Sequence, residues 1–174
     1  QQVSSAASDV YKRQPIRDGK ITFDDFSTQL LNLIDELSIE KIHLVGFSIG
    51  SLIARNFATK YNNRLQTLTL LNSIFHRSNP QQKIVDERFE KSKSSNIISN
   101  DALIRWFTED YLKKNQKTSE WISSILNKNN MKNFNKVYEL FVKHKDDEDF
   151  KKIKAETLVI TGEGDVGSTP EMSK

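Results

Sequence analysis

The stretch from residue 42 to residue 71 constrains the fold more than any other part of the chain. Residues 42–45 form a short, mostly β-branched and apolar run that ends at a glycine, which is typical of a buried parallel strand. Residues 51–61 predict a helix, and residues 65–71 predict a second strand. The residues expected on the inward side of that helix are Leu52, Ile53, Phe57 and Tyr61. Strand, helix and strand in this order indicate a βαβ unit with a right-handed crossover.

The flanking segments extend this α/β pattern. A helix is expected to begin at Thr22, because Thr22 and Asp25 have the spacing of a capping box. Its apolar stripe consists of Phe23, Phe26, Leu30, Ile34 and Leu37. Residues 157–161 return to a strand, so we expect parallel strands near residues 41–46, 65–71 and 156–161.

Residues 80–150 have a different character, with four helical stretches and no strand between them. An all-helical insert between two strands of one sheet is typical of a lid. The expected organisation is therefore a core in residues 15–79 and 151–174, with a helical lid at 80–150. Residues 1–14 fit neither part and resemble a non-native leader, which we expect to be poorly packed.

Composition excludes several classes of function. The net charge of +3 is small and the basic residues are interspersed with acids, so a nucleic-acid partner is not indicated. No apolar run approaches the ~20 residues of a membrane span, and no membrane partner is expected. Cysteine is absent, which excludes disulfides and thiol chemistry. The default location is the cytoplasm, and the oligomeric state stays open.

Residues 46–50 form a G-x-S-x-G motif between the first predicted strand and its helix. In that context the motif predicts a nucleophile elbow, which exposes Ser48 on a sharp turn above the sheet. Close approach of the chain is expected to require both Gly46 and Gly50. The backbone N–H of Ile49, directly after the serine, is the expected oxyanion-hole donor.

Four segments together resemble the α/β-hydrolase fold family: residues 22–26, 43–51, 71–73 and 158–165. Within it, the sequence is most similar to members of the 3-oxoadipate enol-lactonase-like and carboxylesterase type, in which an Asn-Ser pair leads into a lid with an Arg-Trp-Phe segment. The resemblance implies that Asp165 is the acid of a Ser-His-Asp triad. It implies no cofactor and no metal, and a small-molecule ester or lactone as substrate.

The resemblance also implies a histidine after the acid, and none of the three histidines follows Asp165. His43, His76 and His144 all precede it, and we expect none of them to be the base. The loop that supplies a second oxyanion donor has no counterpart here. We therefore expect a fragment, truncated at both ends, that is inactive by itself.

Two functions remain open at this stage. The first is a serine hydrolase that cleaves carboxylic esters or lactones through an acyl-enzyme at Ser48, with Trp106 and Phe107 as candidate substrate-binding residues. Ordinary core packing is the alternative role for those two aromatic residues. The second function is a non-catalytic ligand-binding or interaction protein on the same scaffold, because a fold alone does not fix function.

Overall fold

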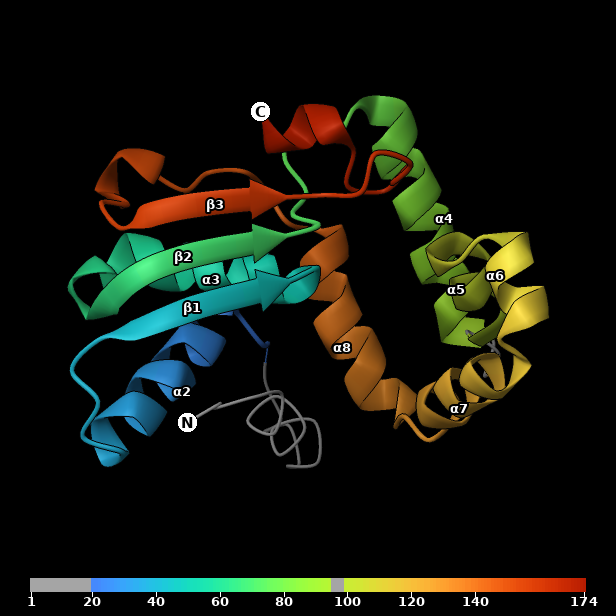
Figure 1. Cartoon of the computed structure of the whole chain (residues 1–174), viewed down its shortest axis with the longest axis horizontal. Helices are drawn as coiled ribbons and strands as arrows, with labels where there is room; N and C mark the ends of the chain where they lie inside the picture. The colour runs from blue at the N-terminus through green and yellow to red at the C-terminus, as the bar shows by residue number, and fades with distance from the viewer. Residues whose placement is uncertain (1–19, 95–98) are drawn as a thin grey trace. The chain divides into compact units, whose positions relative to one another are not determined.

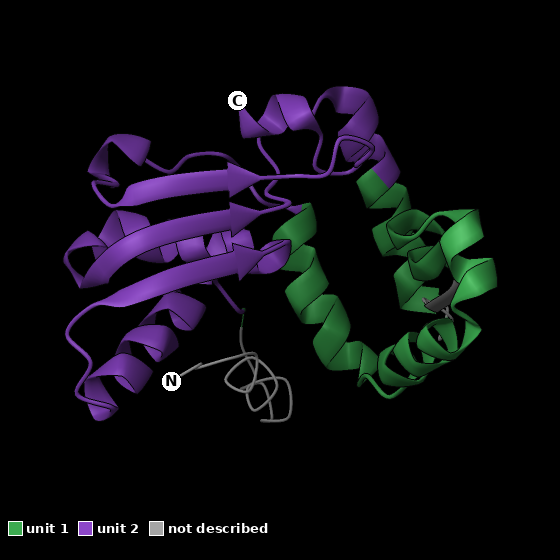
Figure 2. Cartoon of the chain, in the orientation of Figure 1, with its two compact units in different colours: residues 1–20, 85–142 green, residues 21–84, 143–174 purple. Residues whose placement is uncertain are grey.

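The structure is a computed structural model that describes residues 20–94 and 99–174. The leader expected at residues 1–14 lies outside the described residues. The chain divides into two compact units (Figure 2), which are described separately: one holds Ile21–Ile84 and Lys143–Lys174, and the other holds Val85–Val142. Among the helices in the described ranges, none is both long and apolar enough to cross a membrane.

The unit of Ile21–Ile84 and Lys143–Lys174, unit 2 in Figure 2, is built on a parallel sheet of three strands in the order β1-β2-β3 (Figure 1). The strands are β1 Ile42–Phe47, β2 Leu65–Leu71 and β3 Glu156–Ile160. Phe47 pairs with Leu71, and Leu71 pairs with Ile160. The three carboxyl ends therefore meet at one edge of the sheet, which confirms the predicted parallel α/β architecture.

Two helices cover one face of this sheet, α2 Phe23–Glu36 and α3 Ile49–Lys60. The predicted capping box is present at the start of α2, where Thr22 and Asp25 exchange hydrogen bonds. The core between helices and sheet consists of Ile34, Ala54, Phe57, Ala58, Leu65, Leu68 and Leu70. Short 3-10 helices follow at Asn62–Arg64, Phe150–Lys152 and Pro170–Ser173.

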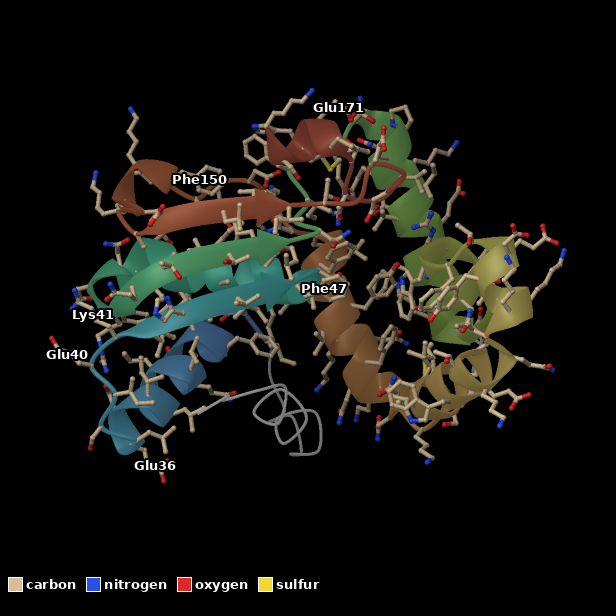
Figure 3. The ribbon with its side chains drawn as sticks, viewed as in Figure 1. Glu36, Glu40, Lys41, Phe47, Phe150 and Glu171 are labelled. Carbon is tan, nitrogen blue, oxygen red and sulfur yellow. The ribbon has the colours of Figure 1, made fainter. Side chains whose placement is uncertain are left out.

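The opposite face of the sheet carries apolar side chains that are open to solvent within the described residues. Phe47, labelled at the carboxyl end of β1 in Figure 3, is 65% exposed, and Val45 on the same strand is 60% exposed. Leu158 and Ile160 of β3 are similarly exposed. Strands of a parallel sheet are normally buried on both faces, so this face is unusual.

The other unit, unit 1 in Figure 2, is entirely helical in its described part. Helix α4 (Asn79–Ser94) leads into it, followed by α5 Ser99–Trp106, α6 Glu109–Lys114, α7 Gln116–Asn127 and α8 Met131–Val142. No strand lies among the described residues of 80–150, and the role of this segment as a lid stays a prediction. Four helical stretches were expected, and α6 is an additional one.

Helix α6 was missed because it is short and lacks an apolar stripe. Its signals are local: the Thr108 side chain accepts a hydrogen bond from the Tyr111 N–H, acids occupy the first turn, and lysines occupy the last. The α4–α8 contact buries Val85, Phe89 and Val142 and includes a hydrogen bond from Ser92 Oγ to Asn135 Oδ1.

Candidate active site

The G-x-S-x-G motif forms the tight turn between β1 and α3. Ser48 has φ 55° and ψ −122°, a conformation that L-residues rarely adopt. Such a backbone costs on the order of 1–3 kcal/mol and persists only where its surroundings fix it. Here the Ser48 N–H donates to the carbonyl of Leu71 at 2.9 Å, which fastens the turn to β2. The side chain does not cap α3.

The two glycines of the motif are not equivalent. A Cβ on Gly46 would lie 2.4 Å from the carbonyl oxygen of Gly50 and 2.7 Å from the Cα of Ser51. These are backbone atoms that cannot move aside, so position 46 requires glycine. A Cβ on Gly50 would meet nothing within 4 Å. The expectation that both glycines are required for close approach is therefore wrong for Gly50, because the crowding falls on the strand side of the turn.

Ile49 is the first residue of α3. Its N–H belongs to the first four of the helix, which have no acceptor within the helix and favour negative charge. The position is suitable for the oxyanion donor expected there, and that role stays a prediction.

Asp165 lies on the turn after β3, and its carboxylate is held by three donors. Oδ1 accepts from the N–H groups of Gly167 and Ser168, at 2.8 Å each. Oδ2 accepts from Nδ2 of Asn72 at 2.5 Å. The turn itself is closed by a bond from the Asp165 N–H to the carbonyl of Gly162 at 3.0 Å.

Ser48 and Asp165 follow strands that are separated by β2 alone. Two strand spacings place the ends of β1 and β3 about 10 Å apart. That separation can accommodate one imidazole ring between a serine hydroxyl and a carboxylate. Asn72 follows β2 and donates its N–H to the carbonyl of Ile160 at 2.8 Å, which extends the hydrogen bonding between β2 and β3 by one residue.

All three histidines of the chain are among the described residues, and none has a described contact with Ser48 or Asp165. His43 lies on β1, where its Nδ1 is 2.8 Å from the Thr67 hydroxyl. His76 has an exposed side chain and donates its backbone N–H to Asp146. The His144 side chain is 4% exposed and packs edge-on against Phe23.

A second polar cluster surrounds Arg55 of α3, whose side chain is 3% exposed. Nη1 donates to the carbonyl of Ile74 at 2.6 Å, and Nη2 donates to Asp146 and Glu148 at 2.8 and 2.7 Å. The guanidinium also lies over the ring of Phe150, 4.8 Å from its centroid. Arg55 therefore ties the segment after β2 to the segment before β3.

Ionisation in this cluster is shaped by burial and by the arginine. Burial alone would raise the pKa of Asp146, but the hydrogen bonds from Arg55 and the His76 N–H outweigh it and hold the pKa below its ordinary value. Burial lowers the pKa of His144, and the nearby Glu148 carboxylate opposes this only in part. The ligand atoms of His144, Asp146 and Glu148 lie within 4.8 Å of one another, a spacing that could suit a divalent cation. Arg55 already supplies a positive charge to both carboxylates.

Sequence reasoning missed both Arg55 and Asn72 as organising residues. Arg55 was one charge in a helical pattern, and its partners lie 91 and 93 residues away. Asn72 was noted only as part of an Asn-Ser pair. The usable signal for Arg55 is its position on the inward side of an otherwise apolar helix segment, one residue after Ala54.

Trp106 and Phe107 belong to the helical unit. Trp106, the last residue of α5, is 56% exposed, and Phe107 stacks on Tyr111 with ring centroids 5.0 Å apart. The stacking on Tyr111 is consistent with a packing role for Phe107 within the helical unit. Substrate binding by either residue stays a prediction.

A strand-turn-helix elbow on a parallel sheet is typical of the α/β-hydrolase fold. The family model described as alpha/beta hydrolase fold matches residues 5–100, and the chain belongs to this family. That match begins inside the segment that we expected to be a leader.

Individual relatives are similar to this chain at moderate identity. The (E)-2-((N-methylformamido)methylene)succinate hydrolase of Acinetobacter baylyi is 25% identical over 155 residues, 86% of this chain and 57% of that protein. The enol-lactonase of Burkholderia xenovorans superposes with a TM-score of 0.75 at 24% identity, covering 89% of this chain and 60% of that one. A thermophilic esterase of Thermogutta terrifontis gives 0.77 at 22% identity, covering 92% and 61%. The chain thus spans about three fifths of the length of these relatives.

Proposed function

We propose that this chain carries the nucleophile and the acid of a serine hydrolase that cleaves carboxylic esters or lactones. The observation that carries the proposal is the elbow itself: Ser48 is held in a strained conformation between β1 and α3, at the sheet edge where Asp165 also lies. The enol-lactonase and esterase among the structural neighbours are consistent with that substrate class.

In the proposed reaction, Ser48 Oγ attacks the carbonyl carbon of the ester while an imidazole takes the hydroxyl proton. The tetrahedral oxyanion is stabilised by the Ile49 N–H, and the alcohol leaves with the proton returned by the imidazole. Water then hydrolyses the acyl group from Ser48. Asp165 orients the imidazole and stabilises its charged form.

We further propose that the general base is none of the three histidines of this chain, since none of them has a described contact with Ser48 or Asp165. His144 in particular is enclosed by Phe23, Asp146 and Glu148. The chain alone should then show little Ser48-dependent turnover, because triads lose most of their rate when one member is absent.

The test is chemical rescue of the 174-residue chain with added imidazole. Hydrolysis of p-nitrophenyl acetate and butyrate is measured over a series of imidazole concentrations, with Ser48→Ala subtracted to remove the direct reaction of imidazole with the ester. Ser48-dependent turnover should rise with imidazole and should be lost in Asp165→Asn. Ser51→Ala is the matched control for a nearby hydroxyl.

Two results would contradict the proposal. No Ser48-dependent turnover at any imidazole concentration would argue for a binding protein on the same scaffold. Turnover without imidazole within about tenfold of the Thermogutta terrifontis esterase would show that a histidine of this chain serves as the base.

A further inference from the structure

Asn72 occupies the position between the elbow and the acid turn. It follows β2 directly and has φ 50°, a left-handed conformation that asparagine adopts more readily than most residues. Its N–H donates to the carbonyl of Ile160 at 2.8 Å, and its own carbonyl accepts from the hydroxyl of Ser168 at 2.9 Å. The backbone of Asn72 is thus bound to both ends of the turn that carries Asp165.

The side chain of Asn72 completes the environment of the Asp165 carboxylate. Each carboxylate oxygen can accept about two hydrogen bonds. Oδ1 already accepts two, from the N–H groups of Gly167 and Ser168. Oδ2 accepts one described bond, from Asn72 Nδ2 at 2.5 Å. The remaining acceptor position is therefore on Oδ2, the oxygen that Asn72 holds.

We propose that Asn72 is a positioning residue for ester hydrolysis, which fixes the Asp165 carboxylate so that Oδ2 is presented to the imidazole N–H. This inference rests on the proposed function of Ser48 and Asp165. Asn72 acts through Asp165 and does not touch the substrate. Its contribution is orientation, and misplacement of a catalytic group by about 1 Å can cost up to a hundredfold in rate.

An asparagine suits this task for two reasons. Its amide donates a hydrogen bond without adding a charge beside the carboxylate, and its backbone tolerates the left-handed conformation. Glycine at this position would keep the backbone bonds and remove only the amide. Aspartate would keep the shape and replace the donor with a second carboxylate.

These two variants give a direct test on the 174-residue chain. The side-chain couplings of the Asp165 β-protons, measured by NMR, distinguish one fixed rotamer from an average over several. We expect one rotamer in the wild-type chain and averaging in Asn72→Gly and Asn72→Asp. A single, unchanged rotamer in both variants would overturn the proposal. This measurement needs no turnover, so it reports on Asn72 even if Ser48 proves unreactive.

The imidazole-rescued reaction supplies the second readout. Asn72→Gly should lower the Ser48-dependent rate roughly 10- to 100-fold at saturating ester, with the ester KM little changed, because only the imidazole loses its orientation. Asn72→Asp should be at least as impaired. A loss confined to thermal stability, with the rescued rate within about twofold of wild type, would show a purely structural role and would also overturn the proposal.

Discussion

Replacing Arg55 with methionine tests how much the buried ion cluster contributes to stability. Methionine is a good helix former and fills a similar volume, so the change removes chiefly the guanidinium. It leaves the Asp146 and Glu148 side chains, 11% and 9% exposed, without their cation. It also removes the donor to the carbonyl of Ile74.

The expected loss is large because two half-buried carboxylates, Asp146 and Glu148, are left without their cation. Removing one member of a buried ion pair typically costs about 3–5 kcal/mol, and we expect Arg55→Met to lie in that range. A domain with a total of about 5–15 kcal/mol would lose a substantial part of its free energy of unfolding. Arg55→Lys keeps the charge but loses the fork geometry, and it should fall between the wild type and methionine.

Lys60→Met is a matched control on the same helix. Lys60 pairs with Asp24, but their side chains are 40% and 58% exposed, and such surface pairs contribute about 0–1 kcal/mol. Urea denaturation followed by far-UV circular dichroism gives the free energies for all three variants. Equal, small losses for Arg55→Met and Lys60→Met would refute the reasoning. The second test adds Asp146→Asn and Glu148→Gln to Arg55→Met. If the loss of stability comes from the two unpaired carboxylates, removing their charges should recover part of it. No recovery would also refute the reasoning.

Three further predictions concern pH, the elbow and a helix cap. The pKa of Asp146 and that of His144 are both lower in the folded chain than in the unfolded chain, so the unfolded chain binds protons more readily. Stability should therefore fall on acidification, beginning at about pH 6.5 for His144 and near pH 4 for Asp146. A denaturation midpoint that stayed constant from neutral pH to about pH 5 would contradict the His144 part. Gly46→Ala should lower the thermal midpoint by the equivalent of about 1–3 kcal/mol, because its methyl group would meet the backbone of Gly50 and Ser51. Gly50→Ala lies in open space on a helix and should leave the midpoint unchanged or raise it. Equal losses in the two variants would show that the crowding is not confined to position 46. Thr22→Ala should cost about 1 kcal/mol in urea denaturation through the lost cap of α2, and an unchanged midpoint would show that the cap is dispensable.

The parts of the fold that depend on neighbouring residues could be predicted from the sequence. The strand before Gly46, the helix after Ser48 and the capping box at Thr22 are short-range patterns, and all three are present in the structure. The boundaries agree within about two residues, because hydrogen-bond ladders and caps begin and end where the chain changes character.

The partners of buried polar side chains could not be predicted in the same way. Asp146 and Glu148 lie in a run of mixed charges that is typical of a solvated surface, yet both are half-buried and pair with the buried Arg55. Nothing in their local sequence separates them from Asp147 and Asp149, which are exposed. Which of these acids pairs with Arg55 is decided by the tertiary structure. A buried guanidinium requires hydrogen-bond acceptors, and only folding brings residues this distant in sequence into contact with it.

Consecutive positions at the end of β2 join the two candidate groups of the active site. The carbonyl of Leu71 accepts the N–H of Ser48, and the next residue, Asn72, donates its N–H to Ile160 and its side-chain amide to Asp165. The separation of Ser48 and Asp165 is thus fixed by a strand ladder and not by loops alone, and sites on regular elements are held more rigidly than sites on loops. Substitutions in the helical unit Val85–Val142 that leave this ladder intact should therefore preserve the geometry of Ser48 and Asp165, whereas substitutions at position 72 should change it.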